Sequence, residues 1–152
     1  MKSNTLSGSY SLDSGVLIEM LAATPLGQLM NQCLLSDSVI AHTSYLNLSE
    51  AEYILCRKVG HELSRSKVEN LLRSNYLNVI DMEQLHAIAA QTKCERSLAL
   101  ADCYSLATAK FTKSKALFAF KEEELIKEIN KTPGEVEIEF LEDAAPNPAT
   151  SK

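Results

Sequence analysis

The sequence of 152 residues contains no tryptophan and only five glycines, four prolines and four cysteines. Its glycines form neither a Walker-type phosphate loop nor a Gly-x-Gly-x-x-Gly pattern, which argues against a nucleotide-binding loop. No apolar run approaches the ~20 residues that span a bilayer, and the N-terminus lacks the apolar core of a signal peptide. There is no Cys-x-x-Cys pair and no zinc-type spacing, so we expect buried, reduced thiols at Cys33, Cys56, Cys94 and Cys103. These absences predict a cytoplasmic protein with no membrane contact.

The chain also has fewer positive than negative charges, because it contains 15 lysines and arginines and 20 aspartates and glutamates, which gives a net charge of −5. A nucleic-acid-binding protein usually carries a basic face, so the overall sign argues against one. The excess is concentrated near the C-terminus, however, since residues 135–152 hold five acids and one base. The other 134 residues hold 15 acids and 14 bases, so the body of the chain is nearly neutral.

Short β-branched runs alternate with amphipathic stretches, which predicts an α/β fold with a mostly parallel sheet. We expect strands at 9–12, 38–43, 77–80, 116–120 and 135–140. We expect helices at 14–21, 25–33, 46–59, 64–74, 81–93, 98–112 (capped by Ser97) and 122–130. The apolar run at 116–120 is typical of a strand buried on both faces, and the alternation at 135–140 of a half-exposed edge strand. Residues 1–141 would form one domain, and residues 142–152 a flexible C-terminal tail.

Acidic residues follow predicted strands or lie early in predicted helices. Asp13 follows the first strand, Glu50 lies early in a long helix, and Asp102 stands in an Ala/Leu-rich helix start. Glu122 and Glu123 follow the fourth strand. Because the carboxyl ends of parallel strands meet at one edge of a sheet, these carboxylates would converge there, and Mg²⁺ accepts such oxygen ligands. The simpler interpretation makes Asp13 a helix cap and the glutamates solvated charges near helix N-termini.

Three segments around these acids carry a family resemblance. They read Leu-Asp-Ser at 12–14, Asn-Leu-Ser-Glu-Ala-Glu-Tyr-Ile-Leu at 47–55, and Leu-Ala-Leu-Ala-Asp-Cys-Tyr-Ser-Leu-Ala-Thr-Ala-Lys at 98–110. Together they resemble a PIN domain, closest to the VapC-like toxin ribonucleases of archaea and bacteria. The third segment is the most specific, and the resemblance extends over residues 10–140.

The resemblance implies a three-layer α/β/α fold around a five-stranded parallel sheet. It also implies that Asp13, Glu50 and Asp102 hold Mg²⁺ or Mn²⁺, with Glu50 rather than its neighbour Glu52 as the second acid. The implied activity is cleavage of single-stranded RNA by a metal-activated water, as in the toxin of a toxin–antitoxin pair. The implied partners are a small antitoxin protein and a second copy of the chain in a homodimer.

The fourth acidic position departs from the family pattern. Many members carry an aspartate directly after the fourth strand, whereas this chain has Lys121 after Phe120. Glu122, one residue later, is the expected substitute as the fourth metal ligand, and Glu123 is the other possibility. If neither reaches the metals, the chain would be a catalytically weak PIN scaffold that binds RNA or protein.

Two groups of basic residues are candidates for contact with RNA. They are Arg57, Lys58, Arg65, Lys67 and Arg73 in the second helical region, and Lys110, Lys113 and Lys115 just before the fourth strand. Scattered lysines and arginines are also typical of solvated helix faces. Without its four proposed ligands, the body of the chain would hold 11 acids against 14 bases. The acidic total is therefore compatible with a metal-dependent nuclease.

Overall fold

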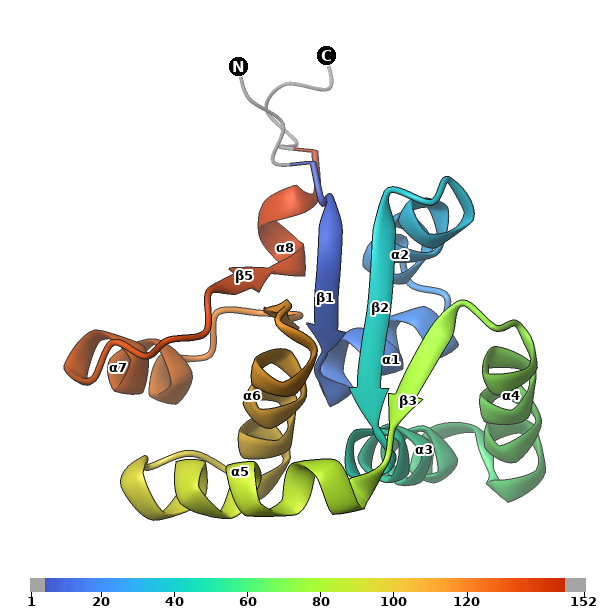
Figure 1. The fold of residues 1–152 in the computed structure, drawn as a ribbon. Coiled ribbons are helices and arrows are strands. Elements are labelled where there is room, and N and C mark those ends of the chain that lie inside the picture. The colour runs from blue at the N-terminus through green and yellow to red at the C-terminus, as the bar shows by residue number, and fades with distance from the viewer. Residues whose placement is uncertain (1–4, 147–152) are drawn as a thin grey trace.

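The computed structural model describes residues 5–146 and contains one sheet of five parallel strands in the order β3-β2-β1-β4-β5 (Figure 1). The strands are β1 (Gly8–Leu12), β2 (Val39–Ser44), β3 (Leu77–Ile80), β4 (Lys115–Phe118) and β5 (Ile138–Phe140). The helices are α1 (Ser14–Leu21), α2 (Pro25–Leu35), α3 (Tyr45–Val59), α4 (His61–Arg73), α5 (Met82–Glu95), α6 (Leu100–Thr112), α7 (Glu123–Lys131) and α8 (Leu141–Ala144). The predicted three-layer α/β/α architecture is confirmed.

The central strand β1 is covered on both faces. Tyr10 and Leu12 lie in the larger apolar core, to which α1 and α2 also contribute. On the other face, the Ser11 hydroxyl donates a hydrogen bond to the Ser105 carbonyl in α6 at 2.7 Å. The chain therefore leaves β1 between α1 and α6, and Asp13 is the first residue at that point.

The residues that end and begin helices behave as their chemistry predicts. The Thr24 hydroxyl accepts the N–H of Gly27 and caps α2, with Pro25 at the first helical position. Gly60 ends α3 with a φ of 91°, a backbone angle that glycine adopts without strain. This sharp turn lets α4 begin at His61, three residues earlier than the amphipathic pattern predicts.

Three further predicted elements differ from the structure in their bounds. The strand expected at 116–120 ends at Phe118, and Phe120 is 46% exposed instead of buried. The strand expected at 135–140 is indeed at the sheet edge, but only Ile138–Phe140 pair with β4. The helix expected from residue 98 begins at Leu100, and Ser97 does not cap it.

Residues 141–146 pack beside the loop that follows β4. Leu141 is fully buried, and the Glu142 N–H donates to the Ala119 carbonyl at 3.1 Å. The helix α8 thus includes the first residues of the segment expected to be a flexible tail. Residues 147–152, the rest of that segment, lie outside the described residues.

Within residues 5–146, no helix combines the length and the apolar character needed to cross a membrane. All four cysteines are free. Cys103 is buried as expected, but Cys33 and Cys56 are only partly buried and Cys94 is exposed. The expectation of four buried thiols is therefore wrong for three of them.

Candidate functional site

The four acids singled out by the sequence stand on four elements around the carboxyl-terminal edge of the sheet. Asp13 follows β1 and occupies the N-cap of α1, and Asp102 lies in the first turn of α6. Glu50 lies in the second turn of α3, which begins where β2 ends. Glu122 occupies the N-cap position of α7, after β4. Because β2, β1 and β4 are neighbours in the sheet, these segments meet although they are far apart in the sequence.

Asp13 is a buried carboxylate held by two donors. Its Oδ1 accepts the Ser105 hydroxyl at 2.6 Å, and its Oδ2 accepts the Gly15 N–H at 3.3 Å. Burial raises the pKa of Asp13 to about 6, although these two hydrogen bonds act in the opposite direction. Asp13 is therefore a helix cap, as the simpler interpretation holds, and also a carboxylate whose charged form is disfavoured by burial.

Asp102 is partly buried, and its pKa is raised to about 7. Burial is the largest cause, followed by the negative charges of Asp13 and Glu122 and then of Glu50. Like charges raise the pKa of a carboxyl group in this way when they lie close to it. The structure thus brings Asp13, Glu50, Asp102 and Glu122 into one electrostatic group, called here the acidic cluster.

The chemistry of the acidic cluster fits a divalent cation. Carboxylate oxygens are the ligands that Mg²⁺ and Mn²⁺ prefer, and a cation among them would relieve the repulsion that raises the pKa of Asp102. Among residues 5–146, no three His, Cys, Asp or Glu side chains already form a group that could hold a metal ion. A cation would therefore have to draw the carboxylates of the cluster closer together as it binds.

Lys121, which stands where the resemblance predicts an acid, contacts α8. Its backbone N–H donates to Glu142 Oε2 at 3.3 Å, and its ammonium group pairs with Asp143 at 2.6 Å. The charge of the next residue, Glu122, is the one that reaches Asp102. This arrangement favours Glu122 over Glu123 as the fourth acid.

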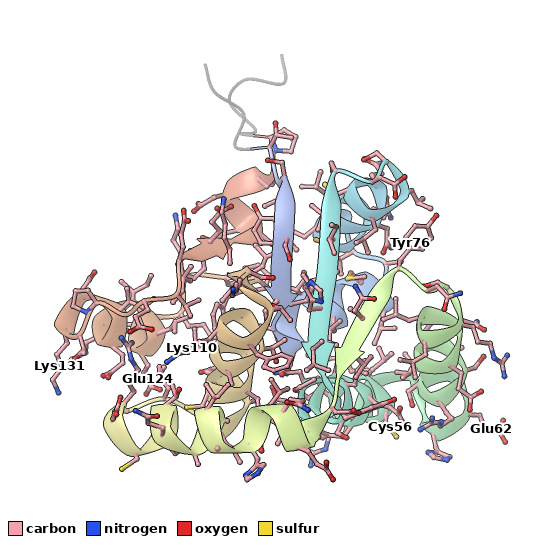
Figure 2. The ribbon with its side chains drawn as sticks, in the orientation of Figure 1. Cys56, Glu62, Tyr76, Lys110, Glu124 and Lys131 are labelled. Atoms are coloured by element: carbon pink, nitrogen blue, oxygen red, sulfur yellow. The ribbon has the colours of Figure 1, made fainter. Side chains whose placement is uncertain are left out.

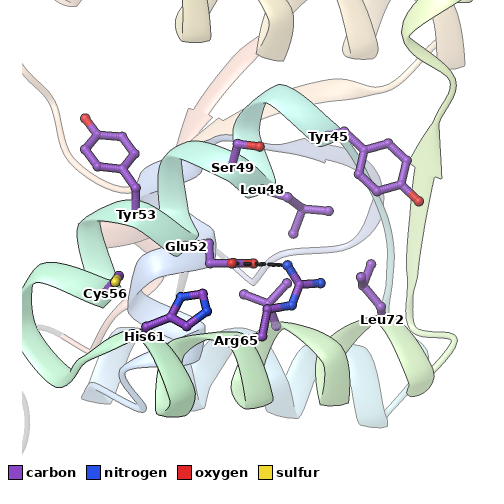
Figure 3. Close-up of a pocket in the computed structure, with 10 residues that line it drawn as sticks. Tyr45, Leu48, Ser49, Glu52, Tyr53, Cys56, His61, Arg65 and Leu72 are labelled. Atoms are coloured by element: carbon purple, nitrogen blue, oxygen red, sulfur yellow. Dashed lines mark hydrogen bonds and ion pairs between the residues drawn. The ribbon is translucent and has the colours of Figure 1, made fainter.

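Glu52 faces a different surface from its neighbour Glu50. A hollow of about 300 Å³ lies between α3 and α4, and there the Glu52 carboxylate accepts hydrogen bonds from Arg65 Nη1 at 3.2 Å (Figure 3). Side chains two positions apart on a helix point in nearly opposite directions. The pairing of Glu52 with Arg65 therefore favours Glu50 as the acid of the cluster.

Asn47, a residue that the sequence analysis missed, joins the elements around the cluster. It is fully buried, and its Nδ2 lies within hydrogen-bond distance of Ser14 Oγ (3.0 Å), Ser105 Oγ (3.0 Å) and the Ala101 carbonyl (3.1 Å). Its Oδ1 accepts the Ser44 hydroxyl at 2.5 Å. The sequence carries one signal of this role, because Asn47 is a polar residue on the apolar stripe of α3.

The basic residues are dispersed. Lys110 lies near the C-terminal end of α6, and Lys115 begins β4 at the opposite edge of the sheet from the acidic cluster. Lys115 also pairs with Glu139 at 2.8 Å. On α3, the Arg57 guanidinium lies 5.0 Å from the centre of the Tyr53 ring. Lys110 and Arg57 lie on helices that carry an acid of the cluster, but Lys110 is at the opposite end of α6 from Asp102.

Comparisons with known proteins agree with the fold. The sequence family described as the PIN domain matches residues 10–131. A chain of the DNA-bound VapBC complex from Salmonella typhimurium superposes with a TM-score of 0.64 at 18% identity, covering 88% of this chain and 98% of that one. VapC20 from Mycobacterium tuberculosis, a toxin that cleaves the sarcin–ricin loop, gives 0.59 at 17% identity, covering 78% and 94%. VapBC2 from Rickettsia felis, bound to a fragment of its promoter, gives 0.60 at 16%, covering 87% and 98%. No curated protein sequence matches this chain.

Proposed function

This chain belongs to the PIN domain family, and from that premise we propose that it is a metal-dependent endoribonuclease that cleaves phosphodiester bonds in single-stranded RNA. The observation that carries the proposal is the acidic cluster, in which three carboxylates help to raise the pKa of a fourth, Asp102, to about 7. Strong perturbation by burial and like charge is typical of functional sites. A divalent cation that also contacts a phosphodiester would offset the repulsion.

Each acid of the cluster has a role in this proposal. One Mg²⁺ or Mn²⁺ would be held by Asp13, Glu50 and Asp102, with Glu122 helping to hold a second. When bound, the metal supplies an activated water and offsets charge on the phosphoryl oxygens. The chain itself supplies orientation, because the Ser105 hydroxyl fixes the Asp13 carboxylate and Asn47 contacts Ser105 in turn.

The proposed partners follow those of the structural neighbours. Several neighbours are toxin–antitoxin complexes, which supports a small antitoxin as the partner of this chain, and we also propose a homodimer in the cytoplasm. The second candidate function is a catalytically weak PIN scaffold that binds RNA or protein, which Lys121 favours. Since Lys121 contacts α8 and Glu122 contributes the missing charge, the nuclease is the better supported of the two.

Removal of the metal tests the proposed activity. Labelled single-stranded RNA should be cut by the purified protein in Mn²⁺, and EDTA should abolish the cleavage, which excess Mn²⁺ should then restore. Gel electrophoresis of the labelled RNA gives the readout. RNA that is bound but stays intact in Mn²⁺ would contradict the nuclease and favour the scaffold.

Glu122→Gln is expected to lower the rate of cleavage about 10–100-fold, because it removes one charge from the cluster at nearly constant size. Glu123→Gln is the matched control and should cleave at close to the wild-type rate. Lys121→Gln should also keep the rate, and it should leave the free energy of unfolding nearly unchanged because its ion pair with Asp143 is exposed. Equal losses in Glu122→Gln and Glu123→Gln would rule against Glu122 as the fourth acid.

A further inference from the structure

Four exposed aromatic residues lie on the segments that carry the acidic cluster, and two of them, Tyr53 and Phe120, are closer in sequence to one of its acids than Tyr45 and Phe111 are. Tyr53 on α3 is 47% exposed, and Phe120 in the loop between β4 and α7 is 46% exposed. Each stands three or fewer positions along the chain from an acid of the cluster, Glu50 and Glu122 respectively. Exposed apolar side chains gathered beside a polar site are typical of a binding surface.

Tyr53 stands one helical turn beyond Glu50 on the same flank of α3. Glu50, Tyr53 and Arg57 follow the i, i+3, i+7 spacing that aligns side chains on one helix face. Tyr53 also borders the hollow between α3 and α4, and Figure 3 shows its ring directed away from Arg65 and the carboxylate of Glu52. The Arg57 guanidinium lies over the ring at 5.0 Å from its centre. One face of the ring is therefore next to a cation, and the exposure of Tyr53 leaves ring surface for a stacking partner.

Phe120 stands in a loop that is fixed on both sides. The preceding residue, Ala119, packs on α1 so closely that a Cβ at Gly15 would come within 3.3 Å of the Ala119 Cβ. Two residues after Phe120, the Glu122 N–H donates to the Phe120 carbonyl at 2.9 Å, which closes a tight turn. Phe120 therefore lies between Ala119, which packs on the first turn of α1, and Glu122, and its side chain is partly exposed to solvent.

We propose that Tyr53 and Phe120 are base-stacking residues, which hold unpaired bases of single-stranded RNA beside the phosphodiester at the acidic cluster. This inference rests on the proposed function and deepens it. Aromatic rings stack on any base because every base has a π face, so the two rings confer affinity for single strands without strong sequence preference. Arg57 adds a cation beside one of the rings, suited to a neighbouring phosphate. Bases in a duplex are stacked on one another, so the rings select against double strands.

The charges next to the rings favour RNA over a protein helix as the occupant. A helix bound in a groove needs a continuous apolar stripe. Tyr53 is flanked instead by Glu50 and Arg57 on its own helix face, and Phe120 is followed by the charged residues 121–124. Alternation of rings and charges matches a ligand in which bases alternate with phosphates.

Fluorescence of 2-aminopurine measures stacking separately from cleavage. A short single-stranded RNA of mixed sequence that carries 2-aminopurine is titrated with protein in Ca²⁺, used in place of Mn²⁺. Wild-type protein should change the fluorescence as the base stacks on a ring. Tyr53→Ala and Phe120→Ala should each weaken binding about tenfold and reduce the fluorescence change, whereas Tyr53→Phe should retain both.

Phe111→Ala and Tyr76→Ala are matched controls, because these residues are 43% and 41% exposed. Phe111 lies near the C-terminal end of α6, nine positions beyond Asp102. Tyr76 directly precedes β3, at the amino-terminal edge of the sheet (Figure 2). Both variants should bind RNA as the wild type does, and circular dichroism melts should show that all variants fold.

The outcomes separate stacking from the proposed function. Wild-type RNA affinity in both Tyr53→Ala and Phe120→Ala, equal losses in the two controls, or no fluorescence change with wild-type protein would overturn the stacking role. So would alanine variants that lose a protein partner while keeping their RNA affinity. If RNA stacks on the rings but is never cut in Mn²⁺, the nuclease fails and the stacking role stands. If RNA is cut and KM is unchanged in the variants, the nuclease stands and stacking fails.

Discussion

Replacing Asp102 by asparagine is expected to abolish Mn²⁺-dependent cleavage of RNA and to make the metal-free protein more stable. Asparagine keeps the size of the side chain but lacks the charge that would bind the cation, so we expect a loss on the order of 10³-fold or more. The same change removes a partly buried charge and its repulsion by Asp13, Glu122 and Glu50. Activity and stability therefore move in opposite directions, as expected for a carboxylate that serves a ligand.

The gain in stability is expected to depend on pH. The ordinary pKa of an aspartate is 3.8, whereas folded Asp102 has a pKa of about 7. Between these values the folded protein binds the proton more tightly than the unfolded chain, so stability falls as the pH rises through this window. The wild type thus carries the full penalty above the folded pKa. Allowing for partial solvent screening, Asp102→Asn should gain about 1–3 kcal/mol near pH 8 and clearly less near pH 5.

Unfolding in EDTA at both pH values measures this gain, and cleavage in Mn²⁺ measures the loss of activity. Asp81→Asn is the matched control, because Asp81 also stands at the start of a helix but is exposed and forms no side-chain cap. It should change neither quantity. Mn²⁺ should raise the Tm of the wild type and of Asp81→Asn but not of Asp102→Asn. If Asp102→Asn cleaved RNA at the wild-type rate, Asp102 would not belong to the proposed site. If Asp102→Asn were less stable than the wild type in EDTA, the proposed repulsion between Asp102 and the other acids of the cluster would be contradicted.

The sequence predicts the fold well where particular residues start or end a helix, as Thr24-Pro25 and Gly60 do. The local sequence pattern does not predict the length of a strand when pairing with a neighbouring strand sets that length. The alternation over residues 135–140 predicts a six-residue strand, but only Ile138–Phe140 of this segment form a strand paired with β4. Directly before β5, the Glu137 carbonyl accepts the Ala116 N–H at 2.9 Å, and farther back Arg96 donates a hydrogen bond to the Thr132 carbonyl.

The acids of the site can be recognised from the local sequence, whereas the residues that surround them cannot. Asp102 stands out because it interrupts an Ala/Leu-rich helix start. Phe120 continues the apolar run of β4 in the sequence, and only the folded structure, in which Ala119 packs against α1 and Phe120 is exposed, shows that the strand has ended. The sequence can mark Asn47 as a polar residue on a buried stripe, but its partners come from other elements and only the fold brings them together.

Asn47→Ala is expected to destabilise the protein by about 3 kcal/mol and to lower cleavage about 10–100-fold. Alanine removes every hydrogen bond of the Asn47 side chain at a site that is 0% exposed. The Ser44 hydroxyl loses its acceptor at 2.5 Å, and the Ala101 carbonyl loses one of its donors, at 3.1 Å. Buried polar groups left without partners, together with the small cavity, account for the expected loss.

The loss of activity has a separate cause, the orientation of a hydroxyl proton. The Ser105 oxygen lies close to two acceptors, Asp13 Oδ1 at 2.6 Å and the Ala101 carbonyl at 3.2 Å. While Asn47 occupies the Ala101 carbonyl and donates to the Ser105 oxygen, the proton of that hydroxyl is directed to Asp13. In Asn47→Ala the hydroxyl can turn to the Ala101 carbonyl, and Asp13 then loses a donor that favours its charged form.

Urea unfolding and Mn²⁺ affinity separate these two effects. Asn78→Ala on the exposed side of β3 is the matched control and should leave stability and cleavage close to those of the wild type. Asn47→Ala that is still folded at the assay temperature should bind Mn²⁺ more weakly, since a less readily charged Asp13 is a poorer ligand. Wild-type Mn²⁺ affinity with lower stability would reduce Asn47 to a purely structural residue. If Asn47→Ala were as stable as the wild type, the hydrogen bonds of the Asn47 side chain would not stabilise the fold as proposed.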